Sequence, residues 1–297
     1  MKAIQQLKQA LQEASAVVIG AGSGLSTAAG LTYSGGRFQR YFSDFIGKYG
    51  IRDMYSGGFF PFANGNEYWA WWSRVIYLNR YVPAPTDVYP RLYELVRHSD
   101  YFVLTTNVDH QFQKAGFDKQ RLFYTQGDYG LFQARHPLTA RTYDNEAAIV
   151  AMMRAQGFVY DENRYLVPPE EGTVSMQVPT ALLPRCPEDG QDMVPNLRCD
   201  DTFVEDAGWK AAARRYQQFL QEHQQGRVLY LELGVGMNTP GIIKIPFWQY
   251  TQANPQAVYA CVNASDARSP EWIRPQAIAV ERDIADVLTE LEGGRVS

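Results

Sequence analysis

Two apolar runs end abruptly in polar side chains that could bind and orient a substrate. The run 101–104 leads into a segment that carries Asn107 and Asp109, and the run 121–125 leads into Gln126 and a glycine. An Asx turn that closes a strand is the alternative for the first pair. We favour a functional role because an amide and a carboxylate occur together. Gln126 can donate and accept hydrogen bonds but cannot act as a base.

A glycine-rich segment near the N-terminus has the composition of a phosphate-binding turn. The sequence VVIGAGSGLSTAAGLTYSGGRF at 17–38 places Gly20, Gly22 and Gly24 between an apolar strand and a helix start. Such glycines allow close backbone approach to a pyrophosphate, and the helix supplies free N–H groups. An ordinary strand–helix turn is an equal alternative. Arg37 follows, in what we expect to be a mobile loop. There it either contacts phosphate or ribose, or it is a loop charge exposed to solvent.

The elements that position these residues alternate along the chain. The predicted strands are 16–19, 101–106, 122–125, 228–233 and 257–262, and the predicted helices are 1–15, 89–97, 209–224 and 283–291. This alternation predicts an α/β fold, a Rossmann-like parallel sheet with helices on both faces. No strand with an acidic end follows the glycine segment, which argues against an ordinary dehydrogenase.

Two segments interrupt the alternation. Residues 36–85 are rich in aromatics and glycine, with one clear helix around 67–81, and residues 128–200 hold a helix from about Asn145, with Asp144 as its cap. We predict that 36–85 and 128–200 form a smaller inserted domain. The nucleotide-binding domain then consists of residues 1–35, 86–127 and 201–297.

The carboxyl ends of the predicted strands indicate where a ligand binds. In open parallel sheets the ligand crevice lies beyond these ends. Four predicted strands finish there in polar or glycine groups: Gly20-Ala21-Gly22, Asn107/Asp109, Gln126-Gly127 and Gly234-Val235-Gly236. This convergence predicts a nucleotide site.

Composition excludes some classes of function. The net charge of −4 argues against a general nucleic-acid surface, which needs a basic excess. The three cysteines have no close spacing, which fits a reducing cytoplasm. We expect no membrane span, because no apolar run approaches about 18 residues. The first 15 residues lack the core of a signal peptide.

The ordered motifs resemble those of the sirtuins, over nearly the whole chain. The matching groups are the Gly-Ala-Gly loop at 20–22, Asn107-Val108-Asp109, Ala115-Gly116, Gly234-Val235-Gly236 and Val262-Asn263. Sirtuin deacylases place His-Gly where this chain has Gln126-Gly127, and their Pro-Asp-Phe-Arg loop corresponds to the segment 31–38. The segments GLSTAAGLTYSGGRF, PNLRCDDTFVED and LELGVGMNTPG are instead similar to the bacterial class M sirtuins (SirTM).

The resemblance implies a set of partners and binding roles. Class M sirtuins are associated with protein ADP-ribosylation, with a lipoylated carrier of the glycine-cleavage H type, and with a macrodomain hydrolase. By position, Asp109 would hold the nicotinamide carboxamide of NAD, and Asn107 would lie beside the ribose. Phosphate contacts would come from Gly20, Ala21, Gly22 and Ser26, with Arg37 nearby, and adenosine contacts from Gly234, Gly236, Asn238 and Asn263.

The missing histidine decides which sirtuin reaction we expect. In deacylation a base takes a ribose hydroxyl proton after an acyl oxygen has attacked C1′. None of the four histidines, His98, His110, His136 and His223, follows the strand that ends at Thr125. His110 is the nearest substitute, although a loop or helix-start role suits it better. Gln126 could orient the ribose, and attack at C1′ by a protein nucleophile remains feasible.

We therefore expect an NAD-dependent protein ADP-ribosyltransferase. The alternatives are a lysine deacylase that tolerates glutamine, an NAD hydrolase, and an NAD or ADP-ribose binding module without catalysis.

The structural zinc of sirtuins needs two cysteine pairs, which this sequence lacks. Cys186 stands in PRCPEDGQDM, with Asp189 at its partner's place, and FQARHPLTA has no cysteine. Cys199 lies outside the ligand spacing, and a site from His136, Cys186 and Asp189 is the remaining alternative. We predict that the protein binds no zinc.

Purified protein is expected to contain far less than one zinc per chain by plasma mass spectrometry, because four thiolates cannot be assembled. One stoichiometric zinc would contradict this, and equilibration with excess zinc followed by desalting controls for metal lost in purification.

Overall fold

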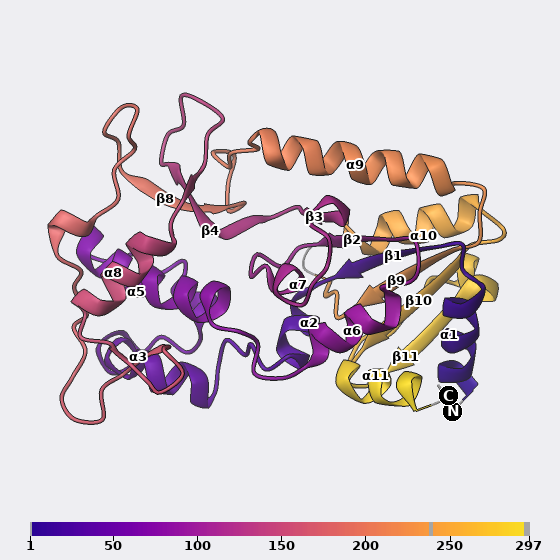
Figure 1. The fold of residues 1–297 in the computed structure, drawn as a ribbon, viewed down its shortest axis with the longest axis horizontal. Helices are drawn as coiled ribbons and strands as arrows, with labels where there is room; N and C mark the ends of the chain where they lie inside the picture. Colours follow the sequence, from indigo (N-terminus) through magenta and orange to yellow (C-terminus); the bar gives the residue numbers. More distant parts are fainter. Residues whose placement is uncertain (1, 238–239, 294–297) are drawn as a thin grey trace. The chain divides into compact units, whose positions relative to one another are not determined.

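The computed structural model describes residues 2–237 and 240–293. Its largest sheet has six parallel strands in the order β11-β10-β9-β1-β2-β3 (Figure 1). The strands are β1 (Ala16–Ala21), β2 (Tyr101–Thr105), β3 (Leu122–Tyr124), β9 (Val228–Leu233), β10 (Val258–Asn263) and β11 (Ala277–Glu281). The predicted α/β fold with a parallel sheet is confirmed.

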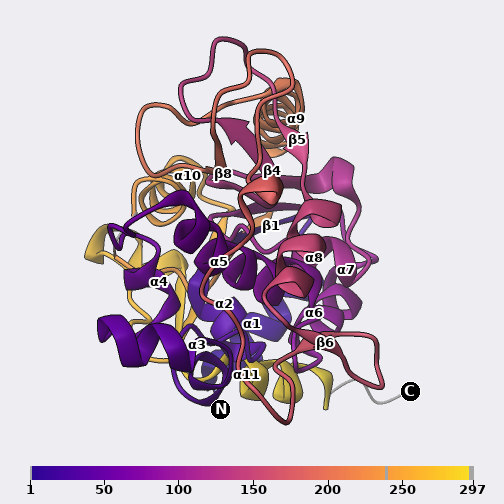
Figure 2. The same cartoon turned by 90° about the vertical axis from the view of Figure 1, so that its left-hand side faces the viewer.

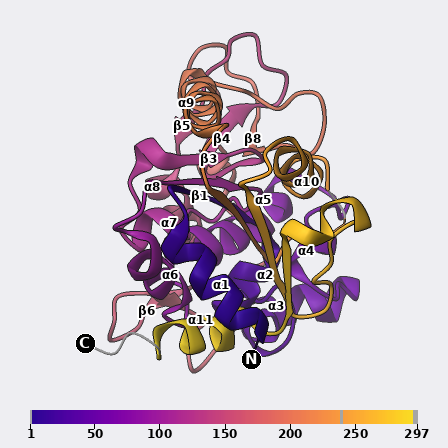
Figure 3. The ribbon, with the colours of Figure 1, turned by 90° about the vertical axis from the view of Figure 1, so that its right-hand side faces the viewer.

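Helices cover both faces of this sheet. One face packs against α1 (Lys2–Glu13), α2 (Ser23–Ala28), α6 (Val88–Val96), α7 (Gln111–Lys114) and α11 (Ile284–Glu292), and the other against α9 (Ala207–His223), α10 (Lys244–Ala253) and the 3₁₀ turn η4 (Glu271–Gln276) (Figure 3). Successive strand side chains point to opposite faces. Val17 and Ile19 therefore join the first core and Val18 the second, and buried strands read as unbroken apolar runs.

Strand β11 and the helices α7 and α10 were not predicted. Strand β11 is an edge strand in which Ala279 and Glu281 are exposed, so its apolar run is broken. Helix α10 has an apolar and polar mixture without a strong stripe, and no start signal precedes it. Most predicted elements are confirmed to within a few residues, including α9, whose C-terminus is closed by the Gly226 N–H bond to His223 O at 2.9 Å.

The chain divides into two compact units. The first comprises Met1–Gly30, Ala84–Gln126 and Ala207–Ser297, and the second comprises Leu31–Pro83 and Gly127–Asp206. The second unit contains α3 (Gly36–Tyr49), α4 (Met54–Gly57), α5 (Gly65–Ile76), the π-helix η1 (Tyr77–Tyr81) and α8 (Glu146–Ala155) (Figure 2). Its antiparallel strands are β5 (Tyr143–Asp144), β4 (Gly127–Ala134) and β8 (Met193–Leu197), with a small hairpin of β6 (Val159–Tyr160) and β7 (Leu166–Val167). The short turns η2 (Lys119–Arg121) and η3 (Thr180–Leu182) belong to the first and second unit respectively.

The expectation of a single helix in 36–85 was wrong. Helix α3 buries Phe38, Tyr41, Phe42 and Phe45 at helical spacing, and flanking glycines had obscured this stripe. The cap of α8 also differs: Asn145 is the N-cap residue, while Asp144 accepts a hydrogen bond from the Glu146 N–H at 3.2 Å.

A buried arginine ties the second unit together. Arg74 of α5 is 0% exposed and forms paired 2.8 Å hydrogen bonds to the carboxylate of Asp44 on α3. It also donates to the carbonyls of Tyr41 and Ser175 and to Gln156 Oε1. A buried charge is stable only when its donors are all used in this way. The assembly of α3, α5 and α8 is thus fixed by one guanidinium.

None of the helices in the described part of the chain is long and apolar enough to cross a membrane.

The turns after β1 and β9 pack backbone against backbone. The Gly22 N–H donates to Leu233 O at 3.0 Å, and the Gly24 N–H donates to Gly234 O at 2.9 Å. A Cβ atom on Gly24 would lie 2.7 Å from Gly234 Cα, closer than atoms can approach. Gly234 itself has φ +61°, a conformation that favours glycine. Three glycines are therefore required where the two turns meet.

Gly24→Ala and Gly47→Ala are expected to change stability in opposite directions, although both glycines are helical. The first meets the Gly234 backbone, which we expect to cost about 1–3 kcal/mol of unfolding free energy. The second faces open space on α3, and alanine there should stabilise by about 0.5–1 kcal/mol. Equal shifts of the two variants in thermal or urea unfolding would contradict the proposed contact.

Candidate active site

The predicted ligand edge lies at a switch in strand order. The chain passes from β1 to β2 and β3 on one side, and β9, β10 and β11 lie on the other. Such a switch point, outside the carboxyl ends of the strands, is where open α/β sheets bind ligands. The turns after β1 and β9, packed on each other through Gly24 and Gly234, form this edge.

The glycine segment has packing roles as well as any role with a ligand. A Cβ on Gly20 would lie 2.4 Å from Ile243 Cγ2, so this glycine lets α10 pack on β1. The Gly22 N–H is already bonded to Leu233 O, and Ala21 O accepts from the Thr106 N–H at 3.1 Å. Phosphate binding by Gly20, Ala21 and Gly22 stays a prediction, since the structure gives a separate reason for two of these residues.

Asn107 and Asp109 are both held by buried hydrogen bonds to the segment that follows β1. Asn107 Nδ2 donates to Gly22 O at 2.9 Å. The hydroxyls of Tyr89 and Ser26 are 2.9 Å apart, and Ser26 Oγ donates to Asp109 Oδ2 at 2.5 Å. Because the one Ser26 proton goes to Asp109, the Tyr89 hydroxyl must donate to Ser26. A chain of hydrogen bonds therefore runs from Tyr89 through Ser26 to the Asp109 carboxylate.

These side chains are almost closed to solvent. Asn107 is 8% exposed and Asp109 is 5% exposed. Burial raises the pKa of Tyr89, and the charge of Asp109 raises it further, so its hydroxyl keeps its proton. Asp109 Oδ1 additionally accepts from the Gln111 N–H at 3.2 Å. Asn107 and Asp109, which the sequence analysis expected to lie together, are thus held rigidly at the end of β2.

Gln126 ends the adjacent strand, as predicted. Thr125 fixes this end, because its N–H and hydroxyl both donate to Thr105 O, at 3.0 and 3.1 Å. The indole of Trp209 donates to Thr125 O at 3.3 Å. Gln126 is half-buried in the turn that follows and is the last residue of this segment of the first unit. Its side chain thus belongs to the carboxyl edge of the sheet.

His110 is the N-cap residue of α7, which agrees with the interpretation that it lies at a helix start. It adopts the left-handed conformation with φ 56°, which is uncommon for a residue with a side chain. Its ring stacks on Tyr124, with centroids 3.6 Å apart and planes 8° from parallel. At 7% exposure it packs inside the first unit, below the end of β3.

The predicted adenosine contacts are only partly described. Gly236 faces open space, and Asn263 Nδ2 donates to Val235 O at 3.2 Å. Asn263 therefore fixes the turn after β9 from the neighbouring strand end. Asn238 lies outside the described residues. Contacts of Gly234, Gly236 and Asn263 with a nucleotide stay predictions.

The expectation that Arg37 stands in a mobile loop was wrong. Arg37 lies in the first turn of α3. Its guanidinium donates to Leu78 O at 2.6 Å, Asn79 Oδ1 at 2.9 Å and Thr32 O at 3.2 Å. These bonds tie α3 to the π-helix within the second unit. Ligand binding by Arg37 stays a prediction, and its structural role is evident.

Sequence reasoning missed a buried ionic group beside the site. Glu232 accepts from Lys244 Nζ at 2.5 Å, from the Tyr259 hydroxyl at 2.6 Å and from Cys261 Sγ at 3.3 Å. Burial and the Glu232 charge raise the pKa of the Cys261 thiol to about 12, so it stays protonated. The sequence signal that could have revealed this group was the single acidic residue in the apolar strand VLYLEL. No sequence signal pointed to Tyr89, because it lies on the apolar face of α6.

The region of the expected zinc module does not fit a four-ligand metal site. Cys186 begins a tight turn, closed by its N–H bond to Gln191 O and by the Gly190 N–H bond to Cys186 O, both 2.8 Å. Hydrogen bonds from the Gln191 backbone and the Cys186 thiol lower the pKa of Asp189, so this turn is closed without a metal. Within residues 2–237 and 240–293, no cluster of three His, Cys, Asp or Glu could hold an ion. The absence of zinc remains a prediction.

Most of the chain is similar to known protein ADP-ribosyltransferases. No protein-family profile matches it. It is 37% identical over 290 residues to a protein ADP-ribosyltransferase of Staphylococcus aureus strain Mu50, covering 97% of this chain and 86% of that protein. It is 31% identical over 247 residues to a probable bifunctional ADP-ribose hydrolase/ADP-ribosyltransferase of Fusarium oxysporum, covering 80% of this chain and 38% of that longer protein.

Solved structures share the fold at low identity. Sir2Tm bound to a propionylated peptide superposes with a TM-score of 0.60 at 17% identity, covering 100% of both chains. Sir2 with a p53 peptide and NAD⁺ gives a TM-score of 0.60 at 16% identity, covering 99% of each. The fold is thus that of the sirtuins, and the chain belongs to the family of sirtuin-type protein ADP-ribosyltransferases.

Proposed function

We propose that this protein transfers ADP-ribose from NAD to a protein acceptor and releases nicotinamide. Identity of 37% along 97% of the chain to a protein ADP-ribosyltransferase supports the reaction class. The observation that carries the proposal is the buried pair Asn107 and Asp109 at the sheet edge, with Gln126 after the next strand. A candidate substrate-binding pair is present, and the residue that follows the adjacent strand is an amide, Gln126, in place of a base.

Each residue has a role that its geometry supports. Asp109 accepts hydrogen bonds from Ser26 and from the Gln111 N–H, which orient its carboxylate, and a carboxylate is the acceptor that the nicotinamide amide requires. Asn107 is held by Gly22 O, which presets its amide for the ribose. Gln126 offers a neutral donor and acceptor to a ribose hydroxyl.

The proposed reaction breaks the bond between the ribose C1′ and the nicotinamide nitrogen. The bonding pair leaves with nicotinamide, which becomes neutral, and a lone pair of the acceptor forms the new bond to C1′. A proton on the acceptor, where there is one, passes to solvent. No step requires Gln126 to accept a proton, in contrast to deacylation.

We propose a lipoylated, glycine-cleavage H-like carrier as the acceptor, on the resemblance to class M sirtuins. The fungal relative, whose printed name joins an ADP-ribose hydrolase to a transferase, supports a functional link to a hydrolase, which we propose to be a macrodomain. In such a pair the hydrolase would remove the modification that the transferase adds.

Asn107→Ala and Gln126→Ala are expected to lower transfer to different degrees. Asn107 supports both the Gly22 turn and the ribose, so its loss should reduce the rate by about 100-fold or more. Gln126 contributes one neutral hydrogen bond, worth about tenfold. Mass spectrometry of a lipoylated carrier after incubation with NAD measures both. Gln120→Ala is the matched control, because Gln120 precedes the same strand at its other end.

Three results would contradict the proposal. One is the absence of any labelled carrier when nicotinamide is released, which would indicate a hydrolase. Another is turnover of an acylated peptide to O-acyl-ADP-ribose, which would indicate a deacylase. Binding of NAD without nicotinamide release would indicate a binding module.

Tyr89→Phe should lower nicotinamide release while the protein stays folded. The ring packs on Phe112 and would remain, while the hydroxyl that orients Ser26 toward Asp109 would be lost. We expect the apparent KM for NAD to rise severalfold, about the effect of one buried hydrogen bond. Tyr93→Phe, on the same helix, should change nothing. Equal kinetics for Tyr89→Phe and wild type would refute the positioning role.

A further inference from the structure

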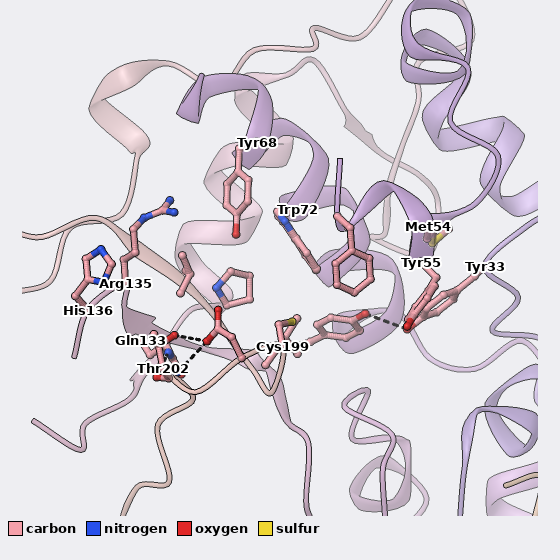
Figure 4. A pocket seen from close by; sticks show the side chains of 17 residues that line it. Tyr33, Met54, Tyr55, Tyr68, Trp72, Gln133, Arg135, His136, Cys199 and Thr202 are labelled. Atoms are coloured by element: carbon pink, nitrogen blue, oxygen red, sulfur yellow. Dashed lines mark hydrogen bonds between the residues drawn. The ribbon is translucent and has the colours of Figure 1, made fainter. Parts of the chain in front are cut away.

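The second unit contains a cavity of about 490 Å³ (Figure 4). Its wall is formed mainly by aromatic rings from α4, α5, β4 and the loops before α3 and after α4, and by apolar residues of β8. The rings are those of Tyr33, Tyr55, Phe59, Tyr68, Trp72 and Tyr129. Pockets of about 300–1,000 Å³ with apolar walls and few polar groups are typical of small-ligand sites. No residue proposed for the NAD reaction lines this cavity.

Two exposed rings mark the rim of the cavity. Tyr55 and Phe59 are each 63% exposed and contact each other edge to face, with centroids 5.3 Å apart. Large apolar side chains grouped at a pocket mouth are typical of binding surfaces. A ligand with an apolar body would cover them.

The hydroxyl of Tyr68 points into the cavity (Figure 4). It forms no hydrogen bond with any residue that the structure describes, although its ring packs on Trp69 and Trp72. Burial raises the pKa of Tyr68, so the hydroxyl is a donor at neutral pH. A donor enclosed by aromatic walls needs an acceptor from the ligand.

Arg135 gives this end of the cavity a positive charge. Its side chain lines the cavity, and its charge acts to lower the pKa of Tyr68 against the larger effect of burial. It forms no ion pair with a carboxylate in residues 2–237 and 240–293. The acid in the wall, Asp200, forms no ion pair with Arg135 and instead accepts from the N–H and hydroxyl of Thr202 through Oδ1, at 2.8 and 2.6 Å. A guanidinium beside a free hydroxyl favours a carboxylate.

We propose that this cavity binds an apolar chain or ring that carries a carboxylate, with the acid group at Tyr68 and Arg135 and the apolar body among the aromatic rings. The argument for this site does not depend on the NAD reaction proposed above. The carboxylate can belong to a free small acid or to the C-terminus of a peptide that ends in an aromatic residue.

Calorimetry with 4-phenylbutyrate tests the charge requirement. The acid should bind, and the matched alcohol 4-phenylbutan-1-ol should bind about tenfold more weakly. Arg135→Gln should weaken acid binding about tenfold and Tyr68→Phe about fivefold. Arg214→Gln, the same change at an exposed position on α9, should leave it unchanged, as should Asn107→Ala in the active site. Melting curves of each variant check folding.

A second arm separates the two sources of the carboxylate. A pentapeptide that ends in phenylalanine with a free carboxylate is compared with its C-terminal amide. Binding of the free peptide but not the amide assigns the site to protein termini, and binding of 4-phenylbutyrate alone assigns it to small acids. Either result supports the proposal.

Cys199 supplies an independent readout that needs no substitution. Its thiol is exposed in the cavity wall, and partial burial and Asp200 raise its pKa. Bound 4-phenylbutyrate should slow its alkylation by N-ethylmaleimide, measured by peptide mass spectrometry at mildly alkaline pH. The buried Cys186 and Cys261 are internal controls. Equal binding of acid and alcohol, no effect of Arg135→Gln, or no protection of Cys199 at about 10 mM acid would overturn the proposal.

Discussion

The contact between two glycine turns is the constraint on which the nucleotide-binding unit depends. Gly22 and Gly24 follow β1, Gly234 follows β9, and no Cβ fits at Gly24 or Gly234. The contact closes the sheet edge at the switch in strand order, and two backbone hydrogen bonds complete it. The same turn exposes Gly22 O to the amide of Asn107. The amide of Asn107 is therefore positioned by the packing of glycines rather than by its own strand alone.

A directional chain of hydrogen bonds leads from Tyr89 through Ser26 to the carboxylate of Asp109. Each member is buried, so a missing partner would leave a polar group without water and would cost more than the bond contributes. Tyr89 is therefore as tightly constrained as the residues that would contact NAD. Rigid placement of this kind suits a reaction that relies on positioning more than on a proton acceptor.

The second unit uses charge in two different ways. Arg74 is fully paired in the interior and fixes the helices α3, α5 and α8. Arg135 has no carboxylate partner among the described residues and borders an aromatic cavity instead. The first arrangement is structural, because a buried charge must be satisfied. The second leaves a cation available to a ligand, beside a tyrosine donor.

The sequence by itself determined five of the six strands of the parallel sheet and the polar groups at their ends, because buried strands have unbroken apolar runs and ligand edges collect glycine, amide and carboxylate residues. It also placed Gln126, which cannot act as a base, at the end of one of these strands. Only the tertiary structure decided that Arg37 belongs to a helix and that Ser26 joins Tyr89 to Asp109. It alone placed Tyr68 beside Arg135. These facts depend on contacts between residues distant in the chain, and local periodicity carries no record of such contacts.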